Sequence, residues 1–197
     1  HYWQHFEFTM DTTFLENRVY PAINEVVHFY FDWLMEDPRD GSLISAPSTS
    51  PENRFIHPNG DTVATCLGSA MDQQIIAEVF DNYIETCKIL HIENSFLDSL
   101  KQKRKKLHTG ITIGSDGRIL EWDREYAEFE KGHRHLSHLY AFHPGNAINQ
   151  TETPEIMGAV KKTLDYRLKH GGAGTGWSRA WTIGMFARLS DSQRAYE

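Results

Sequence analysis

The sequence predicts an all-α fold in which paired helices carry long functional loops. Three observations support this: several segments have helical periodicity, only one short stretch alternates like a strand, and the connections between helices are unusually long. Of the 197 residues, 40% are hydrophobic and 12% aromatic, so the chain can bury a sizeable core. Helices of this number form only part of a helical toroid or solenoid.

The sequence predicts the first helices from a capping pattern and a proline. Asp11 precedes the capping-box pattern of residues 13–16, and Pro21 then starts a helix that we expect to run to about Met35. Apolar residues cover most of the circumference of this second helix, which predicts burial on several sides. The clearest amphipathic pattern follows at residues 69–91.

The rest of the chain alternates shorter helices with irregular stretches. Helices are predicted over residues 94–107, 154–169 and 178–189. Residues 38–67 are rich in Pro, Ser, Asn and Gly, residues 111–120 predict a small hairpin around an Asp-Gly turn, and residues 171–176 form a glycine loop. Loops this long are uncommon in a helical domain unless they build a site.

Charge and composition exclude several classes of protein. The formal net charge is −7, from 20 basic and 27 acidic side chains, which argues against nucleic acid as the main partner. No stretch approaches the roughly 18 consecutive apolar residues of a membrane span. The chain opens in an aromatic run and stops inside a helical pattern. We therefore expect residues 1–197 to be one partial domain, truncated at both ends.

Glu52 is the first residue that could carry chemistry. It lies in residues 47–53 (PSTSPEN), where Ser50 could cap a helix whose first turn contains Pro51 and Glu52. The alternative is a carboxylate on a rigid, proline-flanked loop, where exclusion of water would raise its pKa and make it a general acid. Both interpretations stay open on the pattern alone.

A cluster of imidazoles at residues 133–138 (HRHLSH) also allows two interpretations. His133, His135 and His138 could bind zinc, since three imidazoles are a common catalytic ligand set. However, a fixed cation, Arg134, lies between the first two, which is unfavourable beside a metal dication. Without a metal, Arg134 and His135 offer donors for the hydroxyl groups of a sugar.

Tryptophans lie close to these polar loops in the sequence. They are Trp3, Trp122, Trp177 and Trp181. Each could belong to a core, but tryptophan faces also stack on the apolar face of a pyranose ring, and together these residues favour a carbohydrate ligand.

These motifs, in this order, resemble glycoside hydrolase family 95. They are residues 47–53, 121–122 (EW), 133–139 with 142–145 (FHPG), and 174–178 (GTGWS) with 180–181 and 187–189; residues 3–5 (WQH), Asp11 and residues 20–21 also fit. The resemblance covers essentially the whole chain. It implies an (α/α)6 barrel and an inverting α-L-fucosidase acting on terminal fucose, commonly α-1,2-linked. A minority of the family acts on α-L-galactosides.

The resemblance also implies roles for four residues. Glu52 looks like the general acid, Arg134 and His135 look like contacts to sugar hydroxyls, and Trp3 looks like part of the pocket wall. The family activates water with an Asn-x-Asn and an Asp-Gly-Asn motif, and this sequence contains neither. We expect them upstream and downstream, so that the segment alone is inactive. Glu121 or Asp123 is a less favoured internal base, because Glu121 reads equally well as a loop anchor.

Three alternatives to a fucosidase remain at this stage. They are an α-L-galactosidase of the same family, a zinc-dependent hydrolase using His133, His135 and His138, and a non-catalytic carbohydrate-binding helical protein. No cofactor is expected, and the expected partner is a fucosylated oligosaccharide or glycan. Enzymes that meet extracellular glycans are usually secreted or periplasmic, and we expect one of these locations for the full-length protein.

Overall fold

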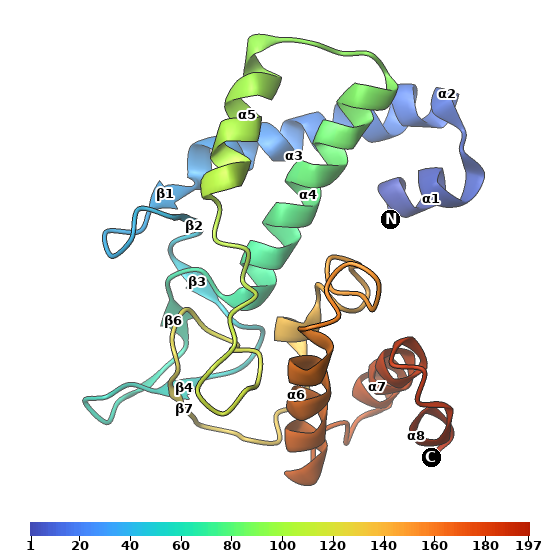
Figure 1. The fold of residues 1–197 in the computed structure, drawn as a ribbon. Helices are drawn as coiled ribbons and strands as arrows, with labels where there is room; N and C mark the ends of the chain where they lie inside the picture. Colours follow the sequence, from blue (N-terminus) through green and yellow to red (C-terminus); the bar gives the residue numbers. More distant parts are fainter. The chain divides into compact units, whose positions relative to one another are not determined.

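A computed structural model describes residues 1–197 and divides them into two compact units. The first comprises His1–Ser45 and Ile75–His108, and the second comprises Ala46–Gln74 and Thr109–Glu197. Figure 1 shows that helices account for most of the regular structure and that the strands are very short. None of the helices combines the length and the apolar character needed to cross a membrane, in agreement with the sequence. The prediction of a helical fold is confirmed in part, because short strands accompany the helices, and the (α/α)6 barrel stays a prediction.

The first unit is built from helices joined by a short strand pair. Its elements are α1 (Tyr2–Thr9), α2 (Thr12–Phe14), a π-helical turn (Leu15–Val19), α3 (Tyr20–Trp33), β1 (Met35–Glu36), β2 (Leu43–Ile44), α4 (Ala70–Ile89, in this unit from Ile75) and α5 (Ser95–Lys106). Asp11 and Asn94 cap α2 and α5 by accepting bonds from Phe14 N (3.0 Å) and Leu97 N (2.8 Å). The core contains Val27, Phe80, Tyr83, Leu97 and Leu100.

Helix α3 corrects one prediction. We expected burial on several sides, but Val27 is its only buried residue, and Val26, Phe29 and Trp33 are 42%, 57% and 43% exposed. The expectation was wrong because only one face of the helix packs against the core of this unit, whereas its apolar residues continue around the other faces.

The second unit surrounds a different core and carries the remaining strands. Its elements are β3 (Ser48–Thr49), β4 (Phe55–Ile56), β5 (Thr62–Val63), β6 (Thr65–Cys66), β7 (Ala127–Glu128), the 3₁₀-helix η2 (Ser137–Leu139), α6 (Met157–Lys169), α7 (Gly176–Arg188) and α8 (Ser192–Tyr196). Strands β3 and β6 pair antiparallel, and β4 lies between β5 and β7. The main core includes Leu136, Leu139, Val160, Leu164 and Met185.

Most helices match the sequence prediction, with shifted ends. Helix α4 occupies the expected amphipathic stretch, but α6 begins only at Met157, and α7 begins two residues early because Thr175 and Ser178 form a capping box. Residues 111–120 form a hairpin-like turn with one antiparallel bridge, Ile113 to Ile119, rather than two strands. The largest sheet has three strands, one more than the small hairpin expected.

Candidate active site

Glu52 lies at the tip of a tight turn, not at the start of a helix. Asn53 N donates to Ser50 O (3.3 Å), with Pro51 in the second position and Glu52 in the third at φ 54°. A type II turn has this arrangement, and its third position usually holds glycine or asparagine. The helix-start interpretation is therefore wrong: Glu52 lies on a proline-containing loop, and its role as a general acid stays a prediction. Phe55 anchors the turn by packing against the buried Trp122, with ring centroids 5.3 Å apart.

Arg134 and His135 lie on a loop that runs close to the end of α6. A Cβ atom on Gly132 would be 2.0 Å from the carbonyl oxygen of His170, so only glycine permits this approach. On the other side of the pair, Leu136 is buried in the main core of the second unit. These two anchors fix the backbone of Arg134 and His135.

His133 connects this loop to the turn of Glu52. Its Nε2 donates to the carbonyl oxygen of Glu52 (3.1 Å), and its Nδ1 accepts from the backbone N of His135 (3.2 Å). Burial lowers the pKa of His133, and the Arg167 guanidinium adds to this effect. One neutral tautomer therefore satisfies both bonds.

Arg134 and His135 meet the side chain of Glu52. The guanidinium of Arg134 forms an ion pair with Oε2 of Glu52, and Nε2 of His135 lies 3.4 Å from the same oxygen, across 83 positions of sequence. Burial and the neighbouring Arg134 lower the pKa of His135, so its imidazole is neutral near pH 7. The Glu52 side chain remains 63% exposed, so a ligand in solvent can reach the carboxylate.

A largely apolar cavity of about 340 Å³ adjoins this group. It is lined by Pro51, Met71, His135, Ser137, Tyr140, His143, Pro144, Trp177 and Trp181. Pro51 and His135 connect it to the turn of Glu52, and its volume suits a monosaccharide-sized ligand. Trp177 is 67% exposed, whereas Nε1 of Trp181 is held by the carbonyl oxygen of His143 (2.8 Å). Two of the tryptophans selected from the sequence thus line a pocket beside Glu52.

The three imidazoles of the zinc hypothesis do not form a ligand set. His133 faces the Glu52 backbone, His135 faces the Glu52 side chain, and Nδ1 of the buried His138 lies 3.8 Å from Oε2 of Glu121. No group of three or more potential metal-ligating side chains in residues 1–197 is arranged to hold an ion. The geometry does not support the zinc alternative.

Trp3 lies in the first unit. Its Nε1 donates to Glu7 Oε1 (2.8 Å), and its ring packs against Phe6 with centroids 5.5 Å apart. Its assignment to the pocket wall stays a prediction.

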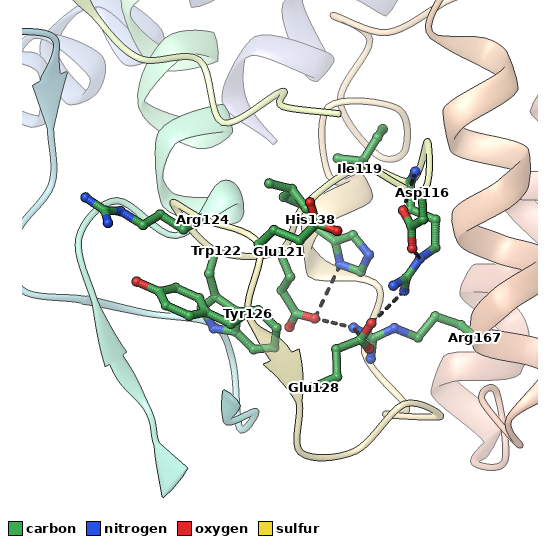
Figure 2. Close-up of a pocket in the computed structure, with 12 residues that line it drawn as sticks. Asp116, Ile119, Glu121, Trp122, Arg124, Tyr126, Glu128, His138 and Arg167 are labelled. Atoms are coloured by element: carbon green, nitrogen blue, oxygen red, sulfur yellow. Dashed lines mark hydrogen bonds and ion pairs between the residues drawn. The ribbon is translucent and has the colours of Figure 1, made fainter. Parts of the chain in front are cut away.

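Glu121 and Arg167 form a buried ion pair in the second unit, shown in Figure 2. Glu121 is 5% exposed and lies beneath the turn of Glu52, so it corresponds to the loop anchor and not to the base. Sequence reasoning missed Arg167, although a signal exists: it continues the buried stripe of Val160 and Leu164 along α6 at helical spacing.

Comparison with known proteins identifies the family of the chain. The model of the glycosyl hydrolase family 95 catalytic domain matches residues 1–197. The chain is 37% identical to Alpha-L-fucosidase 2 of Arabidopsis thaliana and 31% identical to Probable alpha-fucosidase A of Aspergillus niger, in both cases over its whole length. It spans about a quarter of the length of these relatives (23% and 25%). The chain therefore belongs to glycosyl hydrolase family 95.

Proposed function

We propose that the full-length protein is a glycoside hydrolase that removes terminal α-L-fucose, α-1,2-linked, from glycans with inversion of configuration. Residues 1–197 would be a partial (α/α)6 barrel domain that carries the general acid, Glu52. The observation that carries this proposal is the meeting of Arg134 and His135 at one oxygen of Glu52, beside a cavity lined by tryptophans. The two fucosidase relatives support the substrate class.

A general acid has to be protonated when it reacts, and the ion pair explains how ligand binding would achieve this. In the free protein the guanidinium of Arg134 stabilises the ionised form of Glu52. The vicinal hydroxyls of an entering sugar would accept hydrogen bonds from Arg134 and His135 in place of Glu52. A sugar in the cavity also excludes water, and both changes favour the protonated carboxyl. Glu52 would then donate its proton to the glycosidic oxygen.

Inversion requires a second group on the opposite face of the sugar. In an inverting hydrolase the acid and the water-activating group are roughly 6.5–9.5 Å apart, which leaves room for a water molecule. The family motifs for this function, Asn-x-Asn and Asp-Gly-Asn, do not occur in residues 1–197. We therefore propose that the full-length protein supplies them and that the 197-residue segment alone is inactive.

The substitution Glu52→Gln in the full-length enzyme tests the role of the acid. Glutamine keeps the shape of the side chain but has no acidic proton, so kcat should fall by about 10²–10⁴-fold on a natural glycan. An aryl fucoside whose leaving group needs little protonation should lose much less. The ratio of the two losses is the measurement.

Two further variants make the result specific. Arg134→Ala should raise KM and lower kcat on both substrates to similar extents, because it removes sugar contacts and not proton donation. Glu155→Gln removes an exposed carboxylate of the same unit and should leave both activities unchanged. Equal losses of Glu52→Gln on the two substrates would contradict the acid role. Fucose binding without any hydrolysis by the full-length protein would indicate the non-catalytic alternative.

A further inference from the structure

Glu121 connects the two loops of the candidate site through buried hydrogen bonds. The carboxylate is almost fully buried, and its two oxygens have different partners. Figure 2 shows the side of the carboxylate that faces Arg167 and His138. Oε1 accepts hydrogen bonds from Ser50 Oγ and from Asn53 Nδ2 (3.0 Å). Oε2 forms the ion pair with Arg167.

The two donors on Oε1 are the first and last residues of the Glu52 turn. Ser50 and Asn53 are 1% and 3% exposed, so these bonds do not compete with water. One oxygen atom therefore holds both ends of a turn whose third residue, Glu52, has a left-handed backbone that is unfavourable for a non-glycine residue.

The same atoms also reach the sugar-contacting loop. Ser50 Oγ lies 3.0 Å from Ser137 Oγ, and Ser137 is fully buried two residues after His135. The network thus connects the turn of Glu52 to the loop of Arg134 and His135. Glu121 and Ser137 lie 71 and 87 positions after Ser50 in the chain.

Arg167 fixes both the charge and the orientation of Glu121. Burial by itself would raise the pKa of Glu121, but the guanidinium of Arg167 and the bonds from Ser50 and Asn53 lower it to about 2. The carboxylate is therefore ionised near neutral pH. A neutral amide could accept from Ser50 and Asn53 with its oxygen, but its NH₂ group would then face another donor, Arg167.

We infer that Glu121 is a positioning residue of the proposed reaction. Glu121, itself held by Arg167, sets the distance and direction of the Glu52 carboxyl relative to Arg134 and His135. This inference rests on the proposed function of Glu52. Glu121 does not touch the sugar in this role. It acts through the turn, and a displacement of the acid by about 1 Å can cost about 100-fold in rate.

The test is a double-mutant cycle in the full-length enzyme. Ser50→Ala and Asn53→Ala each remove one bond to Glu121 but keep its ion pair with Arg167, so the buried charges stay compensated. We expect each to lower kcat on the natural glycan about 10-fold, and Glu121→Gln to lower it about 100-fold. Losses on an activated aryl fucoside should be several-fold smaller.

The decisive comparison repeats these substitutions in the Glu52→Gln background. If Glu121 acts through the acid, Ser50→Ala and Asn53→Ala cause almost no further loss once the acid is gone. If they only loosen the fold, the same further loss appears in both backgrounds, and the inference is overturned. Asp165→Asn is the control: it removes an ion pair between α6 and α8 (Arg194 Nη1 to Asp165 Oδ1, 2.5 Å) and should keep the parental kcat in both backgrounds.

The cycle also separates this inference from the proposal on which it rests. If Glu52→Gln shows equal losses on the natural and activated substrates, the acid assignment fails, whatever Glu121 does. If Glu52→Gln behaves as an acid variant and the losses from Ser50→Ala and Asn53→Ala are additive with it, only the positioning role fails.

Discussion

Replacing His138 by glutamine should make the stability of the protein less sensitive to mild acid. His138 is 2% exposed, and its pKa is lowered from 6.5 to about 3. Burial is the largest cause, and Arg167, Arg118 and His133 add to it, whereas Glu121 opposes it without compensating. The imidazole is therefore neutral in the folded protein at pH values where it is protonated in the unfolded chain.

The sign and size of the effect follow from this difference. Between pH 6.5 and about 3 the unfolded state binds one more proton at this position than the folded state. The contribution of His138 to stability is thus present above pH 6.5 and is lost as the pH falls towards its folded pKa. Between about pH 7 and about pH 5 the loss for one such group is about 2 kcal/mol. Glutamine does not titrate, so His138→Gln removes this loss.

The loss of stability at low pH can be measured by urea unfolding of the full-length protein, followed by tryptophan fluorescence at about pH 5, 6 and 7. The wild type should lose about 2 kcal/mol more than His138→Gln over this range, whatever constant cost the substitution has. His133, His135 and His143 also have lowered pKa values, but they are present in both proteins and cancel. His170→Gln removes an exposed imidazole as a control. Parallel pH profiles of the wild type and His138→Gln would refute the reasoning.

Two further predictions concern the loop and the cavity. Gly132→Ala would place a Cβ 2.0 Å from the carbonyl oxygen of His170, so the loop of Arg134 has to move. We expect a loss of about 1–3 kcal/mol in unfolding free energy and a lower kcat/KM. The control Gly158→Ala, whose Cβ would have nothing within 4 Å, should change neither the unfolding free energy nor kcat/KM. An aryl α-L-fucoside should have a kcat/KM about 10–100-fold higher than the matching α-L-galactoside, because the apolar cavity offers few partners for the additional hydroxyl. Trp181→Ala should reduce this preference, and equal kcat/KM values in the wild type would show that the apolar cavity does not discriminate between the two sugars.

Most of the helices could be predicted because their signals are local. Helix α5 begins beside Asn94, where the sequence predicts a helix, and the period of α4 identifies a helix close to the observed length. The cap before α2 is Asp11 itself and not the capping box expected at residues 13–16. The exposed faces of α3 could not be predicted, because periodicity reports apolar residues and not what packs against them. Two-residue strands such as β4 and β7 carry no period at all, and their pairing joins segments that are far apart in the sequence.

The candidate site was predictable in its residues but not in its support. Glu52, Arg134 and His135 were selected for their chemistry, and the structure brings them together. Nothing near Glu121 in the sequence reveals that it would hold the turn of Glu52, since its partners lie 46 to 71 positions away. The residues next to Glu52 in the sequence therefore do not show what holds its side chain in place.

The position of Glu52 in the turn explains why such remote support is needed. A turn of this kind is most stable with glycine at its third position, and a glutamate there adds a strained backbone and a charged side chain. A turn that favours a different residue keeps its geometry only if the surrounding structure enforces it. Here the buried carboxylate of Glu121, compensated by Arg167, enforces it from both ends through Ser50 and Asn53. A chain of this family with an intact Glu52 motif but without this ion pair would thus carry a carboxyl group without a fixed direction.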